Sequence, residues 1–398
     1  MKRIPLLVRI VLAIALGIII GQFAPEILIE IAATFTGLFG NFLSFVIPLI
    51  ILGFIAPGIA SMGKGAGKML GLTTGLAYAS TVLAGTAAFL FAKNLYPSFL
   101  QGQRGGSFAN PEESLVEAPF SVEMTPIMGV MAALILSFLL GVGMTAVQGD
   151  SLLHVMNEFR SIIQKVIENI IIPLLPFHIF GIFANMTYAG QVGTILSVFA
   201  KVFLMIIALH LLYLVVIYGI AGSMHGRNPF SLLKKMTPAY FTALGTQSSA
   251  ATIPVTLKQV KKMGVRERVA DFAVPLLANV HLAGSTITIT SCAMAVMYML
   301  GQATTFADVF PFILMVGITM IAAPGVPGGA VMAAIGLLES MLGFDSTMVS
   351  LIIALYLAQD SFGTATNVTG DGAITAIADK LMKKGKQEDI PVSGQNVG

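Results

Sequence analysis

Apolar runs of about 20 residues or more recur along this chain, and each is long enough to cross the hydrocarbon core of a bilayer. The sequence is 56% hydrophobic and only 10% charged, and its mean hydropathy is +0.89. A soluble domain has a far more polar balance. These features predict an all-α polytopic membrane protein that has membrane lipid as a permanent partner.

The expected membrane segments form a regular first part and a less regular second part. The first part comprises residues 4–22, 29–60, 68–93, 124–148, 155–187 and 191–222, and the second comprises 229–257, 267–300, 306–340 and 345–382. The polar stretch 94–123 is expected to be a loop. We interpret the first run as a helix and not as a signal peptide, because it lacks a small-residue cleavage site and many further spans follow it.

Lysine and arginine residues gather in alternate loops, which by the positive-inside rule places both termini in the cytoplasm. The alternation breaks twice in the second part. Basic clusters flank residues 236–257 on both sides, so this segment is expected to leave and return on the cytoplasmic face. The stretches 301–309 and 339–346 contain no Lys or Arg, so the segment between them is expected to enter and return from outside. The charges therefore predict two re-entrant hairpins that enter from opposite faces.

Both expected hairpins carry helix breakers in their middle, GTQSSAATIPV from Gly245 to Val255 and APGVPGGA from Ala323 to Ala330. Gly and Pro leave backbone groups that lipid cannot satisfy, so such backbone has to be buried in protein or line a polar cavity. Two hairpins of opposite direction, each followed by a helix, are typical of inverted-repeat transporters with a binding site between broken helices. The alternative is that Gly and Pro only kink packed helices.

A polar stripe lies in the last apolar segment, DSFGTATNVTGD. Its residues Asp360, Thr364, Asn367 and Asp371 are spaced i, i+4, i+7 and i+11 and fall within roughly 60° of one helix face. Carboxylates and amides are costly inside a bilayer, so they indicate a pathway for ions or a polar substrate. The helix N-termini at the hairpin tips are suited to bind a carboxylate, and free carbonyl groups there are suited to coordinate sodium.

Two other functions fit parts of this pattern. An intramembrane aspartyl protease needs two carboxylates within about 3–5 Å of each other, whereas a continuous helix would separate Asp360 from Asp371 by about 16.5 Å of rise. A passive channel would tolerate the polar face but does not need paired gates. The histidines have no metal-ligand spacing, and no nucleotide-binding loop occurs. We therefore expect neither an enzyme, nor an organic cofactor, nor a nucleic-acid partner.

The motifs SSAATIPVT, GVPGG and NVTGD resemble those of the dicarboxylate/amino acid:cation symporters, which include the glutamate transporters, over about residues 235–382. The resemblance implies eight transmembrane helices plus two re-entrant helical hairpins in inverted repeats. It also implies a homotrimer in the bacterial inner membrane with an elevator-type mechanism. Residues 1–227 would form the scaffold and trimer contacts plus part of the transport domain, 228–383 the transport core, and 384–398 a cytoplasmic tail.

The resemblance also implies roles for individual residues. Asp360 would bind the ammonium group of an amino acid, and Asn367 and the region of Ser249 would hold its carboxylate. Thr364 and the carbonyl groups of Gln247 and Val326 would complete this substrate site.

Two sodium sites are implied as well. Asp371 would bind one sodium ion together with the carbonyl groups of Leu277, His281 and Asn367. Asn279 would bind a second with the carbonyl groups of Met320, Ile321 and Ala323. Oxygen-rich sites of this kind suit a hard cation.

The sequence departs from the family pattern at Gly363, where members with acidic substrates carry an arginine. Burying a second substrate carboxylate without a cationic partner is costly, and Gln247 does not restore the cation. Gly363 leaves room and Ser285 offers a hydroxyl, so we expect a sodium-coupled symporter for serine, threonine or alanine. The alternative is a carrier of acidic amino acids or dicarboxylates coupled to sodium or protons.

A second departure is His281-Leu-Ala-Gly-Ser285, where the family has Asn-Met-Asp-Gly-Thr. The missing aspartate is Ala283, and in the family it helps to form a third sodium site with hydroxyls that Ser80 and Thr81 would supply. Coupling to fewer sodium ions is therefore expected, and protons stay an alternative. The side chain of His281 either senses pH or, as we favour, is a packed neutral histidine.

Overall fold

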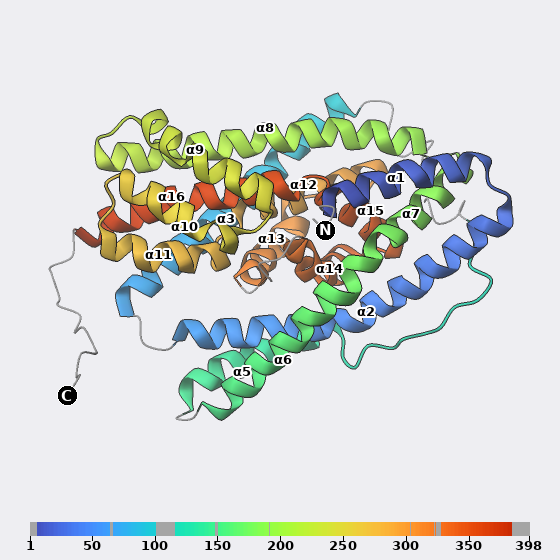
Figure 1. The fold of residues 1–398 in the computed structure, drawn as a ribbon, viewed down its shortest axis with the longest axis horizontal. Coiled ribbons are helices and arrows are strands. Elements are labelled where there is room, and N and C mark those ends of the chain that lie inside the picture. The colour runs from blue at the N-terminus through green and yellow to red at the C-terminus, as the bar shows by residue number, and fades with distance from the viewer. Residues whose placement is uncertain are drawn as a thin grey trace, which may run out of the picture.

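The computed structural model describes residues 6–63, 67–100, 116–147, 150–190, 192–302, 304–321, 323 and 328–383. Within these ranges every regular element is a helix (Figure 1). Within the described ranges, five helical segments are long and apolar enough to cross a membrane. They are Glu26–Ala60, Met69–Phe99, Ser151–Tyr188, Leu196–His225 and Glu267–Met299, the last of which is interrupted between α11 and α12. The pair Ser346–Leu357 and Asp360–Met382, bent by 62°, is a sixth candidate. The all-helical membrane class is confirmed, and the count of eight stays a prediction.

The helices pack into two groups. The first group consists of α1 (Leu6–Phe23), α2 (Glu26–Gly63), α5 (Val130–Ala146), α6 (Ser151–Val166), the π-helix η1 (Ile167–Ile171) and α7 (Ile172–Tyr188). Small residues hold α1 against α7, because a Cβ atom at Gly17 or Gly21 would lie 2.7 or 2.2 Å from a backbone oxygen of α7. Such close approach is typical of helix pairs in membranes.

The second group surrounds the polar stripe. It consists of α3 (Gly67–Phe99), α8 (Val192–His225), α9 (Pro229–Thr246), α10 (Ser249–Lys262), α11 (Glu267–Val280), α12 (Ala283–Met299), α13 (Phe306–Met320), α14 (Gly329–Leu342), α15 (Ser346–Leu357) and α16 (Asp360–Lys383). Helix α3 packs on α12, and α8 and α9 pack on α16. Helices α8 and α16 both end at the left of Figure 1, where α9 begins.

The expected breaks in the second part are present. Hairpin 1, which is α9 with α10, turns at Gln247 in a left-handed conformation with φ of 53°. Hairpin 2, α13 with α14, turns within 321–328, and residues 322 and 324–327 of this tip lie outside the described residues. The helices α11 and α12 are interrupted at His281 and Leu282. Entry of the hairpins from opposite membrane faces stays a prediction from the charge pattern.

Capping side chains explain where several helices begin. Asn228 caps α9, Ser248 caps α10 and Asp345 caps α15 by accepting hydrogen bonds from N–H groups of the first turn. Helix α13 starts with a capping box in which Asp308 accepts from the hydroxyl and N–H of Thr305. These hydrogen bonds favour the charged form and hold the pKa of the exposed Asp308 carboxyl below its usual value.

Two sequence-based boundaries are wrong. Residues 94–99, expected in a loop, continue α3 to Phe99, and the last turn of this helix contains Pro97. The segment expected from residue 124 begins as helix only at Val130, because Pro126 and Gly129 oppose helix before that point.

A charged pair joins the ends of α11 and α16. The Nε atom of Arg266 lies 2.6 Å from Oδ1 of Asp379, and its Nη2 donates to the Asp379 carbonyl oxygen at 2.9 Å. The side chain of Asp379 is fully buried. A buried carboxylate is tolerated only with a partner of this kind.

We expect Arg266→Ala to lower the free energy of unfolding by roughly 1.5–3 kcal/mol, because it leaves the Asp379 carboxylate buried without a cation. Denaturant unfolding of the detergent-solubilised protein measures the change. The control is Arg268→Ala, since Arg268 is exposed two residues further along the same helix. Equal losses for the two variants would contradict a stabilising role of the pair.

Candidate functional site

The polar stripe lies on one uninterrupted helix in the middle of the second group. Asp360, Thr364, Asn367 and Asp371 all belong to α16 and are 5%, 6%, 1% and 1% exposed. Because α16 is continuous between its two aspartates, they are about 16.5 Å apart along the axis. An aspartyl dyad is excluded by this separation, and the carboxylates have separate surroundings.

A small cavity of about 30 Å³ lies where five segments meet beside the stripe. Its walls come from the turn of hairpin 1, the break between α11 and α12, hairpin 2, the end of α15 and α16. The lining residues are Gln247, Ser249, Ala278, Asn279, Leu282, Ser285, Ala323, Ala330, Tyr356, Asp360, Thr364 and Asn367. The cavity has room for water.

Most residues expected to bind substrate line this cavity, although they are far apart in the sequence. They are Gln247, Ser249, Ser285, Asp360, Thr364 and Asn367. Gly363 lies behind them against α12, where a Cβ atom would be 3.6 Å from the Ser285 nitrogen and from Thr288 Oγ1. Val326 lies outside the described residues.

The start of α14 in hairpin 2 is hydrogen-bonded to Asp360. The N–H of Gly328 donates to Oδ2 of Asp360 at 2.7 Å. Gly328 has φ of 76°, a left-handed conformation that favours glycine. This hydrogen bond gives the buried carboxylate a donor and ties the start of α14 to the start of α16.

Asn367 supplies the cap that α12 needs inside the membrane. The first N–H groups of a helix have no partner within it, and lipid offers none. Oδ1 of Asn367 accepts from the N–H groups of Gly284 and Ser285 at 2.7 and 3.3 Å, and its Nδ2 donates to Ser285 Oγ at 3.0 Å. Asn367 thus fixes the Ser285 hydroxyl at the cavity.

The residues expected at the two sodium sites are partly separated. Asn279 and Ala323 line the cavity described above. Met320 and Ile321 lie at the end of α13, and the Leu277 carbonyl at the end of α11 accepts from the His281 N–H at 2.9 Å. Nδ2 of Asn279 donates to the Pro275 carbonyl at 2.9 Å. The amide oxygen of Asn279 therefore points away from α11, and the amide nitrogen points towards it.

Asp371 is engaged by the side chain of His281, a contact that the sequence does not predict. Oδ1 of Asp371 lies 2.8 Å from Nδ1 of His281, and both residues are 1% exposed. Nε2 of His281 lies 3.2 Å from the Tyr213 hydroxyl and 3.3 Å from Ser80 Oγ. The ring is buried as expected, but its surroundings are polar and not an apolar core. Ser80 thus lies beside His281.

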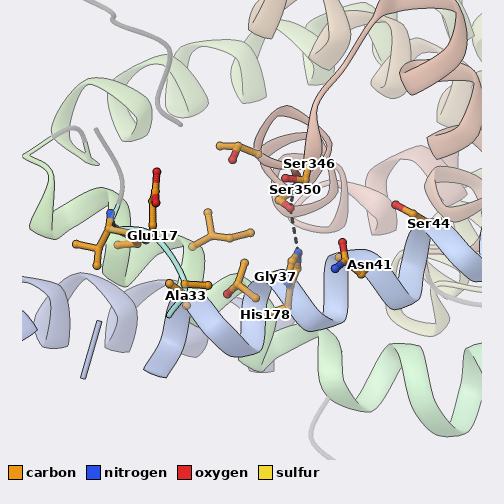
Figure 2. A pocket seen from close by; sticks show the side chains of 16 residues that line it. Ala33, Gly37, Asn41, Ser44, Glu117, His178, Ser346 and Ser350 are labelled. Carbon is orange, nitrogen blue, oxygen red and sulfur yellow. Dashed lines mark hydrogen bonds between the residues drawn. The ribbon is translucent and has the colours of Figure 1, made fainter. Parts of the chain in front are cut away.

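A larger cavity of about 280 Å³ lies away from the stripe, between α2, α7 and α15 (Figure 2). Polar residues line it, including Asn41, Ser44, Glu117 and His178. Figure 2 shows Nε2 of His178 bonded to Ser350 Oγ, at 2.9 Å. The cavity therefore lies where the first helix group meets the second.

Sequence reasoning did not identify this outer cavity. The sequence signal for this cavity is weak. It consists of Ala33, Gly37 and Asn41, small or polar residues spaced four apart on one face of a long apolar helix. Segment 116–118 covers part of it, since Asn185 exchanges two hydrogen bonds of 2.9 Å with the backbone of Val116.

We expect Gly284→Ala to destabilise the protein by about 1–3 kcal/mol, the usual cost of overpacking. A Cβ atom there would lie 2.4 Å from the Gly363 carbonyl oxygen and 2.8 Å from Thr366 Cβ, so α12 and α16 would have to separate. Gly363→Ala is the control, because its Cβ would meet only ordinary contacts at 3.6 Å or more. Thermal unfolding in detergent compares the two, and an equal midpoint would contradict the close packing.

Comparison with known proteins agrees with this architecture. Two similar proteins are both named serine/threonine transporter SstT. The one from Acinetobacter baumannii (strain AYE) is 28% identical over 395 residues, which cover 95% of this chain and 97% of that protein. The one from Streptococcus thermophilus (strain CNRZ 1066) is 25% identical over 404 residues, covering 96% and 98%. The sodium:dicarboxylate symporter family model matches residues 6–381, and the chain, a multi-pass membrane protein, belongs to this family.

Proposed function

We propose that the protein is a sodium-coupled symporter that imports serine, threonine or alanine across the bacterial inner membrane by alternating access. The observation that carries this proposal is the cavity beside α16. Asp360 is the one charged residue among the described residues that line it, and the lining contains amide and hydroxyl groups but no Lys or Arg. Such a site suits a zwitterion with a small neutral side chain.

The two ends of the substrate have separate partners in this proposal. The ammonium group binds Asp360, the buried anion of the cavity. The carboxylate binds at the start of α10, where Ser249 follows the capping Ser248 and the helix dipole favours negative charge. Ser285, held by Asn367, offers a hydroxyl to a serine or threonine side chain. The names of the two relatives support this substrate class.

Hairpin 2 is the gate of the site in this proposal. The cavity of about 30 Å³ is too small for an amino acid, and the Gly328–Asp360 hydrogen bond of 2.7 Å links the start of α14 to the residue that binds the ammonium group. Substrate entry would open the tip and exchange this N–H for the ammonium group. The partner of Asp360 would thereby depend both on whether hairpin 2 is closed and on whether substrate is bound.

Sodium binds at two sites in this proposal. One site uses Asp371 with the carbonyl groups of Leu277, His281 and Asn367. The other lies under hairpin 2 and uses Asn279 with the carbonyl groups of Met320, Ile321 and Ala323. The description of the family supports sodium as the coupled ion. The second site would couple sodium binding to hairpin 2, because Ala323 lies in the same hairpin as Gly328, which bonds Asp360.

The transport movement that we propose is an elevator motion of the second helix group against the first. Support comes from the packing, since α3 and α8 pack with α9–α16 while α1, α2, α5, α6 and α7 pack with each other. The first group would then be the scaffold of a homotrimer. The outer cavity lies on the boundary that such a motion would cross.

Uptake into proteoliposomes tests the proposal. Labelled serine, threonine and alanine are expected to accumulate only with an inward sodium gradient, and aspartate is expected to accumulate weakly because the cavity offers no cation for its second carboxylate. Strong aspartate uptake would instead support the alternative of an acidic amino acid or dicarboxylate carrier. Sodium-independent serine uptake would overturn the coupling.

Asp360→Asn is expected to lower serine uptake by roughly tenfold or more, because the ammonium group loses its charged partner. The control is Asp271→Asn, since Asp271 is an exposed aspartate that pairs with Lys261 at 2.9 Å, far along the chain from the stripe. If Asp360→Asn transports as well as this control, Asp360 does not bind the substrate.

We expect Gly363→Arg to shift preference towards aspartate and glutamate. The site accepts a Cβ atom, and the added guanidinium would supply the cation that a second carboxylate needs. Gly363→Gln is the matched control, because it adds a side chain of similar length without charge. The readout is the ratio of aspartate to serine uptake. An unchanged ratio in the arginine variant would show that Gly363 does not set the substrate class.

A further inference from the structure

A hydrogen-bonded cluster joins four separate parts of the second helix group. It consists of Ser80 on α3, Tyr213 on α8, His281 at the break between α11 and α12, and Asp371 on α16. The Ser80 and Tyr213 hydroxyls are 2.8 Å apart, and both face Nε2 of His281. The imidazole therefore lies between a carboxylate on one side and two hydroxyls on the other.

The direction of the central hydrogen bond follows from the groups themselves. An ionised carboxylate only accepts hydrogen bonds, so Nδ1 of His281 carries the hydrogen that Oδ1 of Asp371 accepts at 2.8 Å. On the other side of the ring, Nε2 faces the two hydroxyls, each of which is able to donate. Every side chain of the cluster is thus bonded to another member, and the ring is held in one orientation.

The surrounding packing fits this ring. A Cβ atom at Gly370, the residue before Asp371, would lie 3.0 Å from Cε1 of His281 and 3.4 Å from the Tyr213 hydroxyl oxygen. A side chain at this position would therefore press on the imidazole. Ala283, two residues after His281, is fully buried and adds no charge. The space beside Oδ1 of Asp371 is occupied by the ring.

The three buried carboxylates of α16 each receive a donor from the chain. Asp360 receives the N–H of Gly328, Asp379 receives Arg266, and Asp371 receives His281. A buried carboxylate without a donor or a cation is costly. The imidazole gives Oδ1 of Asp371 a hydrogen-bond donor, and so provides part of the stabilisation that a bound cation would otherwise give this carboxylate.

We infer that the His281 side chain occupies the position of a cation beside Asp371 and so limits how many sodium ions are coupled to transport. This inference rests on the proposed sodium-coupled function. With Oδ1 committed to the ring, Oδ2 is the carboxylate oxygen left for an ion. A cation on the Ser80 side would have to displace the imidazole and break its hydrogen bonds to Asp371 and to the hydroxyls.

His281→Asn tests the inference, because asparagine is shorter than histidine and adds an amide oxygen that is a suitable sodium ligand. We expect the Hill coefficient for sodium in serine uptake to rise by about one in this variant. The ratio of sodium to serine transported, measured with both labels in proteoliposomes, is expected to rise with it. An unchanged coefficient and an unchanged ratio in a variant that still transports would overturn the inference.

A second measurement does not depend on transport. Bound sodium stabilises the folded protein by mass action, so the thermal midpoint of the purified protein is measured against sodium concentration at constant ionic strength, with choline as replacement. The midpoint of His281→Asn is expected to rise more steeply with sodium than that of the unchanged protein. Equal slopes would contradict the inference even where the variant does not transport.

Two further variants complete the design. Tyr213→Phe removes a hydroxyl that faces the ring, so we expect a smaller change in the same direction, and this variant serves where His281→Asn does not fold. A flat response in both would overturn the inference. His178→Asn is the matched control, because it removes a buried imidazole that bonds a serine and no carboxylate. If the unchanged protein shows no sodium-driven serine uptake, the proposed function is wrong. The role of His281 is then still decided by the sodium dependence of the thermal midpoint.

Discussion

The structure depends on helices that end in the middle of a membrane protein, where neither water nor lipid satisfies the free backbone groups. The four interruptions, at hairpins 1 and 2 and within the α11–α12 and α15–α16 pairs, meet around one small cavity. Polar side chains supply the missing partners. Asn367 caps α12, Ser248 caps α10, and Asp360 accepts from the N–H of Gly328 at the start of α14. The groups that complete the fold are therefore also those that line or adjoin the cavity.

This sharing has a consequence for how the protein works. A ligand that binds Asp360 competes with the N–H of Gly328, and a ligand at Ser285 meets a hydroxyl already held by Asn367. In the proposed mechanism, substrate binding and closure of hairpin 2 alter the same hydrogen bonds, which is the differential contact that a coupled conformational change requires. Asp371 is different, because its partner is the fixed side chain of His281.

The fold was predictable in outline because its strongest signals are local. Apolar runs identify the spans, Gly and Pro identify the breaks, and the spacing of Asp360, Thr364, Asn367 and Asp371 places them on one helix face. The helix ends were less predictable, since α3 continues to Phe99 and α5 begins only at Val130. The lining of the cavity by Gln247, Ser249 and Ser285 was expected from family motifs and not from spacing.

The sequence by itself determined that the chain is a helical membrane protein with a buried acidic stripe, because hydrophobic runs and helical periodicity are properties of neighbouring residues. It also determined the absence of a charge at Gly363. Only the tertiary structure decided that His281 bonds Asp371, 90 positions away, and that Ser80 and Tyr213 hold the ring. It likewise placed the outer cavity between α2, α7 and α15. The physical reason is that hydrogen bonds between side chains depend on which helices pack together, and no local pattern records that choice.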